Sequence, residues 1–528
     1  MPTMTKLNRS AATLTKNRTE GSISPFSGMC VTCVDGCVGM CEIGKSAYRG
    51  HEVLYPQPFG IITAACEKDY PIDLSHFSIM GTAKGAYGAP ADSDKATFEK
   101  VTTETAIGAK KDLKLKLPFV ISGMGSTNIA KQNWAGLGGG AAVSGVILTI
   151  GENVCGMDDE TELKNGKVVR SPDMEFRIKS FRDWQEPGYG DVVVQANVED
   201  TRLGVQEYTI QKLGIETVEL KWGQGAKDIG GEVKLKTVKK AQALKKKGYI
   251  VLPDPDNPKV IEAFEKGSFK EFERHSRMGM VDEGDFMARV AELRKAGAKR
   301  VFLKTGAYRP ADLARAVKFA SKAKLDLLTV DGAGGGTGMS PWRMMNEWGI
   351  PAVEIWSLTW KFADQLAKQG EYVPDLAFAG GITFEDQIFK ALSLGAPYVK
   401  LVGMARSPMA AAMVGKTIGG RIADNQIPVY VERFGNSREE IFVTAPELKH
   451  RFGDRFKDLP AGAIGVYTYF ERLSQGLRQL MAGARKFNLS YIGRDDIAAI
   501  TKEAADISDI PFITDVDKAE VQKILKAK

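Results

Sequence analysis

The stretch Leu325-Asp-Leu-Leu-Thr-Val-Asp-Gly-Ala-Gly-Gly-Gly-Thr-Gly338 decides the fold of this 528-residue chain. Its first half is an apolar run with the length of a buried strand, and its second half is a glycine-rich loop. Similar runs occur along the chain, and between several of them lie amphipathic segments of helical length, such as ADLARAVKFASKA and EDQIFKALSLG. This alternation is typical of βα units and a parallel sheet. The other runs span residues 119–124, 143–150, 192–198, 217–223, 300–306, 376–381 and 398–404.

Eight runs in succession predict an α/β fold, a (β/α)8 TIM barrel, over residues 118–405. An open, doubly wound sheet is the alternative, but it rarely needs eight parallel strands with glycine at most of their ends. Residues 224–299 form a long insertion between the fourth and fifth strands. Residues 406–528 predict a C-terminal helical extension packed on the barrel. In it, RLSQGLRQLMAGARKF has apolar residues at helical spacing, and RDDIAAITKEAADI is interpreted as a short capping helix.

Composition excludes several classes of protein. With 43% hydrophobic and 26% charged residues, the chain is typical of a globular enzyme and not of a disordered, collagen-like or disulfide-stapled chain. The net charge of +7 is spread without a long basic block, so nucleic acid is not an expected partner. No apolar run reaches the ~18 residues that a membrane helix needs, and no secretory signal core precedes the barrel. We therefore expect no membrane partner and a cytoplasmic location.

Glycine-rich loops follow three successive predicted strands, at the end of the barrel that carries active sites in this fold. Because glycine lets backbone N–H groups approach a phosphate, these loops predict a phosphorylated cofactor, and flavin mononucleotide (FMN) suits such a barrel. Tight strand-to-helix turns are the purely structural alternative. Gln195 on the third strand would bond the pyrimidine edge of the flavin. The other predicted cofactor contacts are Ser122, Gly123, Met124, Asp331, Gly332, Gly334, Gly335, Gly336, Thr337, Gly380, Gly381, Gly403 and Met404.

Charged residues near the strand ends are the candidates for chemistry. Lys304, near the end of the fifth strand, can stabilise the negative charge of a reduced flavin, and a lysine reaching to the barrel rim is the alternative. The loop after the fourth strand combines glycines with Lys221 and Lys227, which suit a dicarboxylate. Glu152, after the second strand, can bond an amine or imine or move a proton. Solvated loop charges are the alternative for these residues.

Four of the six cysteines lie within twelve residues near the N-terminus. Residues 1–24 predict a flexible arm, and residues 25–117 a cysteine-rich segment and lead-in to the barrel. The spacing C-x2-C-x3-C-x3-C suits a [4Fe–4S] cluster, because each of its four irons would take one thiolate. Structural zinc is the alternative, but a flavin that needs electrons favours the iron–sulfur cluster, since zinc has no redox role. The predicted ligands are Cys30, Cys33, Cys37 and Cys41.

These motifs carry a resemblance to a known family. The chain resembles the FMN-binding, iron–sulfur synthase domain of glutamate synthase, in the short form found in archaea and anaerobic bacteria. The resemblance implies a barrel that takes electrons through an iron–sulfur cluster and reduces the imine formed from 2-oxoglutarate and ammonia. It also implies that Lys227 holds a carboxylate of the oxo acid and that Glu152 faces the reacting end. The matching stretches, in the order of the family, are TIGEN (149–153), LKWGQGAKDIGG (220–231), DGAGGGTGMSP (331–341), FAGGI (378–382) and YIGRDD (491–496).

The sequence departs from the family pattern in three respects. Glu232, a predicted substrate contact, stands where the family has glutamine, and a carboxylate there favours a related substrate. The family's cluster cysteines usually follow the eighth strand, whereas here they precede the barrel. No glutaminase domain is recognised, so we expect ammonia to be free or delivered by a separate glutaminase subunit.

We therefore expect an oxidoreductase acting on CH–NH2 groups, which aminates 2-oxoglutarate or a related 2-oxo acid reductively with ammonia. One alternative is an N-alkylglutamate synthase that joins methylamine to 2-oxoglutarate, and another is a non-aminating flavin and iron–sulfur electron-relay subunit. An IMP-dehydrogenase-like barrel would need a nucleophilic cysteine, for which only Cys155 lies near a barrel mouth. Electrons would come from ferredoxin or a separate NAD(P)H-oxidising subunit, because no second G-x-G-x-x-G fingerprint follows a strand. A homo-oligomer is left open.

Overall fold

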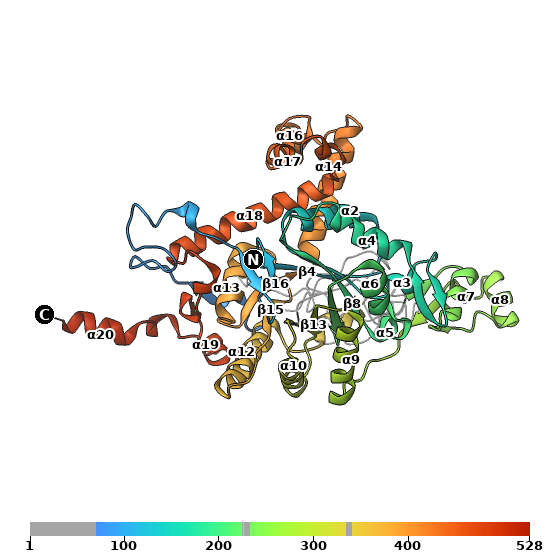
Figure 1. Ribbon diagram of the computed structural model, residues 1–528, viewed down its shortest axis with the longest axis horizontal. Helices are drawn as coiled ribbons and strands as arrows, with labels where there is room; N and C mark the ends of the chain where they lie inside the picture. The colour runs from blue at the N-terminus through green and yellow to red at the C-terminus, as the bar shows by residue number, and fades with distance from the viewer. Residues whose placement is uncertain (1–69, 224, 226–232, 334–339, 528) are drawn as a thin grey trace, which may run out of the picture.

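Eight parallel strands form a closed barrel at the centre of the molecule (Figure 1). The computed structural model describes residues 70–527 except 224, 226–232 and 334–339. The closed barrel confirms the predicted α/β TIM-barrel class, and the alternative of an open, doubly wound sheet is wrong. Around the barrel the strands follow in the order β13 (Arg300–Thr305), β14 (Leu327–Asp331), β15 (Asp375–Ala379), β16 (Val399–Met404), β4 (Phe119–Met124), β5 (Ile147–Ile150), β8 (Asp191–Ala196) and β9 (Thr217–Lys221).

Amphipathic helices cover the outside of the barrel. The predicted helical segments after the fifth and seventh strands are helices α10 (Pro310–Lys322) and α13 (Glu385–Leu394). Helix α10 begins with proline, which lacks the N–H that a first turn leaves unpaired, and buries Leu313, Ala316 and Val317 on one face. The other helices of this outer layer are α2 (Asn128–Val143), α4 (Pro172–Arg182), α5 (Val198–Leu203), α6 (Val205–Leu213), α9 (Glu283–Ala296), α12 (Ala352–Lys368) and α14 (Arg406–Ala423).

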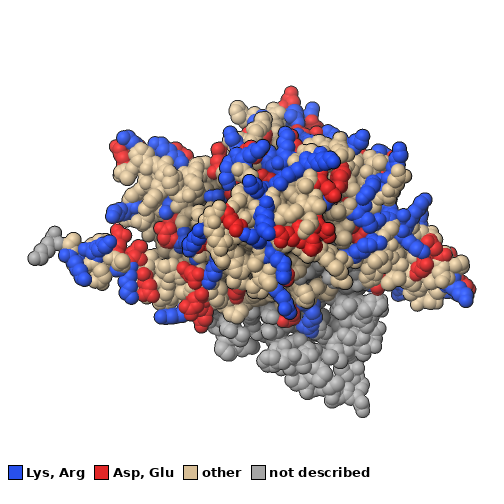
Figure 2. Space-filling model, turned by 60° about the horizontal axis from the view of Figure 1, so that its bottom comes forward, with Lys and Arg blue, Asp and Glu red and all other residues tan. Residues whose placement is uncertain are grey.

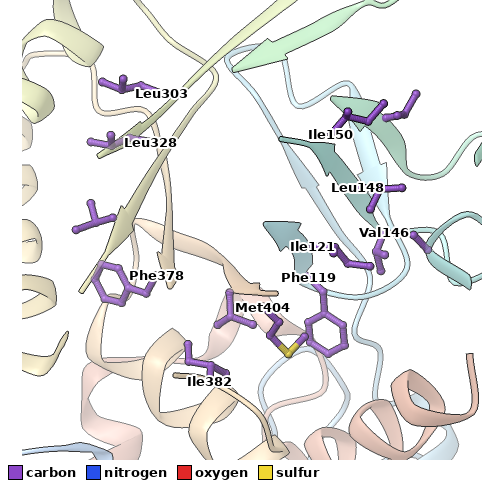
Figure 3. Close-up of a cluster of buried hydrophobic side chains, with 14 of the residues drawn as sticks. Phe119, Ile121, Val146, Leu148, Ile150, Leu303, Leu328, Phe378, Ile382 and Met404 are labelled. Atoms are coloured by element: carbon purple, nitrogen blue, oxygen red, sulfur yellow. The ribbon is translucent and has the colours of Figure 1, made fainter. Parts of the chain in front are cut away.

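Two apolar layers fix the barrel, one on each face of its strands. Strand positions alternate between them: Leu303 and Leu328 belong to the outer cluster, part of which is drawn in Figure 3, and Phe302 and Leu327 to the inner one. The hairpin of β2 (Thr105–Ile107) and β3 (Leu113–Leu115) closes the N-terminal end of the barrel. The inner cluster consists of Ile107, Leu113, Leu115, Val120, Ile147, Val193, Phe302, Leu327, Ala377 and Leu401. Because these side chains fill the barrel toward the N-terminal ends of its strands, the described residues leave room for an interior site only toward the C-terminal ends.

The predicted insertion folds as a small α/β unit beside the barrel, at the right of Figure 1. Its strands β10 (Val233–Leu235), β12 (Phe272–His275) and β11 (Ile250–Leu252) form an antiparallel sheet in that order. Helices α7 (Val238–Lys246) and α8 (Pro258–Glu265) connect them. A second excursion, after β5, contains α3 (Val154–Met157) and the hairpin of β6 (Glu162–Lys164) and β7 (Lys167–Arg170).

The C-terminal region packs on the barrel through a long helix, α18 (Ala461–Gly483), which lies against α2 and α14. The shorter α15 (Val429–Glu432), α16 (Arg438–Ile441) and α17 (Ala445–Phe452) connect α14 to α18. The interpretation of RDDIAAITKEAADI as one capping helix is wrong in its first half. Strand β17 (Ile497–Ala499) pairs antiparallel with β1 (Phe77–Ile79), and only α19 (Lys502–Ser508) is helical. The chain then ends in α20 (Lys518–Lys526), which projects from the body (Figure 1).

The remaining short elements are 3-10 turns: η2 (Leu74–His76), η3 (Phe98–Lys100), η4 (Gly453–Asp458), η5 (Leu489–Tyr491), η6 (Arg494–Asp496) and η7 (Ile513–Asp515). Among the described residues, no helix is both long and apolar enough to cross a membrane. Basic and acidic side chains are interspersed over the face shown in Figure 2. The predicted flexible arm and cysteine-rich segment up to residue 69 lie outside the described residues.

Candidate active site

A layer of buried polar side chains lies directly above the apolar filling of the barrel, at the C-terminal ends of the strands. Burying polar groups costs free energy unless they are paired, so such a layer is unusual in a purely structural core. Its members come from β4, β5, β8, β9, β13 and β14, and each is at most 8% exposed. They are Ser122, Thr149, Gln195, Glu219, Lys304, Thr329 and Asp331.

Gln195 and Glu219 face each other across the neighbouring strands β8 and β9. Nε2 of Gln195 donates to Oε1 of Glu219 at 2.5 Å. Burial raises the pKa of Glu219, whereas the ammonium of Lys304 and the hydrogen bond from Gln195 lower it. Oε1 of Gln195 accepts no hydrogen bond from any described residue, and a Cβ added at Gly123 would lie 2.9 Å from it. The pair therefore presents a buried acceptor beside the end of β4.

Lys304 forms an ion pair with Asp331 inside the barrel, with Nζ 2.9 Å from Oδ2. Burial alone would lower the pKa of Lys304, but the carboxylates of Asp331 and Glu219 raise it above its usual value. The ammonium therefore stays charged at neutral pH. Because the residue is only 5% exposed, the alternative of a lysine reaching out to the rim does not describe it.

A second charged pair lies at the mouth of the barrel, where Nζ of Lys221 is 2.7 Å from Oε2 of Glu152. Glu152 belongs to the loop that follows β5. This loop lies tightly on the end of β4. The N–H of Gly151 donates to the carbonyl of Met124 at 3.0 Å. A Cβ added at Gly125 would collide with the carbonyl oxygen of Glu152. The close approach places the Glu152 carboxylate next to Lys221.

The residue after Glu152 is held from two sides. Asn153 has a left-handed backbone with φ of 64°, and its N–H donates to Oδ2 of Asp200 at 2.9 Å. From the insertion, Arg274 donates to Oδ1 of Asn153 at 3.4 Å, and the hydroxyl of Tyr249 lies at the same distance. Burial raises the pKa of Asp200 to about 7, and the nearby Glu152 contributes to the rise. Helix α5 and the insertion thus both position the Glu152 loop.

The glycine-rich strand ends differ in how much space they leave. Gly332 donates to the carbonyl of Ala379 at 2.9 Å and packs against the start of α12. Gly380 and Gly381 have φ of 126° and 96°, and no atom of a described residue lies within 4 Å of a Cβ added at Gly381. Gly403 lies beside Ser122, whose Oγ would be 2.9 Å from an added Cβ. Among the described residues, nothing therefore blocks access to the exposed backbone of Gly381.

Residues 81–246 and 274–415 match the family model described as "Conserved region in glutamate synthase". The chain belongs to this family. The predicted resemblance to glutamate synthase is thus confirmed, and the unmatched stretch 247–273 contains β11 and α8 of the insertion. A "Glutamate synthase large subunit-like protein" of Rhizobium meliloti (strain 1021) is 25% identical over 435 residues, covering 78% of this chain and 82% of that protein.

Solved structures show a weaker likeness. A flavocytochrome b2 variant with sulfite bound has a TM-score of 0.45 and 14% identity, covering 81% of this chain and 76% of that chain. A lactate oxidase of Pediococcus acidilactici has a TM-score of 0.44 and 14% identity, covering 83% of this chain and 89% of that chain. Likeness at this level says nothing about activity.

Within this glutamate synthase family member, the structure brings together many of the predicted site residues. Gln195 lies beside Gly123, Lys304 pairs with Asp331, Gly380 lies on Gly332, and Ser122 lies beside Gly403. Met404 is different, because its side chain packs in the outer apolar cluster with Phe119 (Figure 3), so only its backbone can face the site. Met124 also packs partly against that cluster.

Other predicted residues lie outside the described part of the chain: Lys227, Glu232, Gly334, Gly335, Gly336, Thr337, Cys30, Cys33, Cys37 and Cys41. Among the described residues, no group of three or more His, Cys, Asp or Glu side chains could hold a metal ion. Cys155 is fully buried, and burial raises the pKa of its thiol, so it is not placed as a nucleophile. The site residues that the sequence did not reveal include Glu219, Asp200 and Arg274.

Proposed function

We propose that this chain is a flavin-dependent oxidoreductase that binds FMN at the C-terminal end of its barrel. In this proposal it aminates 2-oxoglutarate or a related 2-oxo acid reductively with ammonia. Membership of the glutamate synthase family supports it. The observation that carries it is the buried acceptor Oε1 of Gln195, which lies beside Gly123 in a layer that also holds the Lys304–Asp331 pair.

The residues of the polar layer fit a flavin. The pyrimidine edge of an isoalloxazine carries an N–H donor, which would satisfy the buried oxygen of Gln195. The backbone space at Gly381, next to the end of β15, suits a phosphate group that is bound by backbone N–H groups. FMN, when bound, would supply the hydride that reduces a carbon–nitrogen double bond.

Lys304 would provide the positive charge for that chemistry. Its ammonium is fixed in place by Asp331, so it need not reorganise when negative charge develops nearby. The raised pKa of Lys304 keeps this charge over the physiological pH range. Such preorganised charge in a buried site stabilises an anionic state far more than the same charge in water does.

The Lys221–Glu152 pair would handle the substrate. A lysine ammonium at the barrel mouth can grip a carboxylate of an oxo acid, and Glu152 can bond the nitrogen or hold its proton. Lys227 and Glu232 remain predictions as further substrate contacts. Because Asp200 holds the backbone N–H of Asn153 and Arg274 bonds its side chain, the neighbouring carboxylate of Glu152 is held before substrate arrives.

The source of electrons and nitrogen belongs to the same proposal. An iron–sulfur cluster on Cys30, Cys33, Cys37 and Cys41 would pass electrons from ferredoxin or a separate NAD(P)H-oxidising subunit. Ammonia would be free or come from a separate glutaminase subunit. A cytoplasmic location fits such partners.

The test is an anaerobic assay of the full chain loaded with FMN. After chemical reduction, addition of 2-oxoglutarate and ammonium should reoxidise the flavin and yield glutamate. Methylamine in place of ammonium tests the N-alkylglutamate alternative, because a faster reaction with methylamine would favour it. Reduced flavin that persists with every oxo acid and amine would instead support an electron-relay role and overturn the proposed amination.

A further inference from the structure

A pocket lies at the N-terminal end of the barrel, opposite the candidate active site. It has a volume of about 450 Å³ and lies between the β2–β3 hairpin, the start of β16 and residues 488–492. Lys111, Lys114 and Lys400 line it together with Glu104. The proposed reaction uses none of these residues, and the apolar filling of the barrel separates them from the polar layer.

Lys400 is the central residue of this pocket. It is the second residue of β16 and is half-buried, yet within the described chain its ammonium forms no ion pair or hydrogen bond. The nearest carboxylate is already engaged: Asp375 accepts the N–H of Gly108 at 2.9 Å with one oxygen and pairs with Lys111 through the other. Burial lowers the pKa of Lys400 and Lys111 lowers it further, and together they outweigh the nearby carboxylate of Asp375, which raises it.

The remaining lining completes an anion site with an apolar wall. Glu104, the single acidic lining residue, accepts a hydrogen bond from the hydroxyl of Tyr189 at 3.2 Å. With Lys111 paired to Asp375, the three lysines still outnumber the two nearby carboxylates, Glu104 and Asp375, by one positive charge. Its other wall is largely apolar and consists of Leu392, Ala396, Pro397, Leu489 and Ile492. This combination suits an organic anion whose charged group meets the lysines while its body packs on the wall.

We propose that this pocket binds a small organic phosphate monoester, with the phosphate dianion between Lys400 and Lys111. A dianion matches two ammonium groups better than a single carboxylate does, and lysine binds phosphate as a point charge. Binding would also supply Lys400 with the counterion that the protein does not provide. The volume of the pocket lies in the range of small-molecule sites.

Calorimetric titration of the full-length chain with adenosine 5′-monophosphate tests the proposal, with adenosine as the matched neutral probe. We expect the monophosphate to bind one per chain and adenosine not to bind measurably. Lys400→Met should weaken binding at least tenfold. The control Lys318→Met removes a lysine of α10 that pairs with Glu371 and does not line the pocket, so it should leave the affinity unchanged.

Because Lys400 forms no ion pair within the described chain, Lys400→Met should keep the urea midpoint of the parent, which shows that lost binding is not lost folding. Lys400→Gln, which keeps a polar group without charge, should lose binding equally. No binding by the parent at millimolar monophosphate would overturn the proposal. So would equal affinity in the parent and Lys400→Met, which would place the ligand elsewhere. None of these experiments measures turnover, so their outcome does not depend on whether the proposed amination is correct.

Discussion

Gln195 donates its side-chain amide to the buried carboxylate of Glu219 at 2.5 Å and keeps its oxygen free of any described donor. The hydrogen bond fixes the orientation of the amide, because its nitrogen end is the one that donates to Glu219. The oxygen is thereby aimed at Gly123 and the end of β4. A strand pair in the barrel thus holds an acceptor ready for a ligand N–H.

Gln195→Leu should weaken FMN binding about five- to tenfold, since one hydrogen bond is worth about 1 kcal/mol. The substitution also removes the donor to Glu219, so a fall in the free energy of unfolding is expected as well. Fluorescence titration of FMN and urea unfolding measure the two effects separately. FMN affinity equal to that of the parent would show that Gln195 does not contact the cofactor.

Lys304→Met should shift the reduction potential of bound FMN to more negative values and slow its reduction by about 100-fold or more. The physical reason is the loss of the positive charge that Asp331 holds in place. Leaving Asp331 and Glu219 without their cation should also destabilise the fold by about 3–5 kcal/mol. Spectroelectrochemical titration checks the potential.

Lys304→Arg keeps the charge, so the reduction potential of its bound FMN should lie close to that of the parent. If Lys304 had only a structural role, Lys304→Met would leave the potential unchanged. Lys318→Met on the outside of the barrel is the control and should behave as the parent. A parent-like potential in folded Lys304→Met would remove this residue from the chemistry.

Lys221→Met should raise KM for the oxo acid by about 10- to 100-fold, because a hydrogen bond to a charged group is worth about 1.5–3 kcal/mol. The affinity for FMN should change much less than the KM, since Lys221 pairs with Glu152 at the mouth of the barrel. Steady-state kinetics with varied 2-oxoglutarate provide the measurement. The exposed Lys212→Met on α6 serves as the control, and an unaltered KM in Lys221→Met would contradict substrate contact.

Asp200 should make the stability of the fold depend on pH. Its pKa is raised to about 7 by burial, so the folded state holds a proton that the unfolded state, with a pKa of about 3.9, releases. The stabilisation that this bound proton gives the folded state is complete below about pH 4 and is lost as the pH rises to about 7. Between pH 5 and 8 the loss of this contribution should lower the free energy of unfolding by about 2.5 kcal/mol.

Urea unfolding of the parent and of Asp200→Asn at both pH values measures this dependence. The amide cannot ionise, yet its oxygen can still accept from Asn153, so the variant should lose the Asp200 part of the slope. An equal pH dependence in both proteins would show that Asp200 does not titrate in this range.

The barrel could be predicted because its strands are buried on both faces and therefore occur as continuous apolar runs, such as Val192–Val194. Strand β17 could not, because the segment Ile497–Ala499 pairs with Phe77–Ile79, which lies far away in the sequence. Nothing local in RDDIAAITKEAADI indicates that partner, and its apolar residues are equally compatible with a helix.

Some residues of the candidate site could likewise be predicted from the sequence, and others could not. Gln195 and Lys304 could be predicted because they are polar residues near the ends of recognisable strands. Glu219 was missed although period-two alternation along TVELK places it on the same face as Lys221, two positions later. Arg274 could not be predicted, because the packing of the insertion on the Glu152 loop is set by tertiary contacts that no local pattern reveals.

The polar layer of the barrel is the proposed binding site of FMN. The most direct measurement is a titration of FMN into the purified full-length chain under anaerobic conditions, followed by flavin fluorescence and visible absorption. We predict saturation at one FMN per chain with quenched fluorescence, and weaker binding by Gln195→Leu. A chain that remains colourless and leaves the fluorescence of added FMN unchanged would contradict the account.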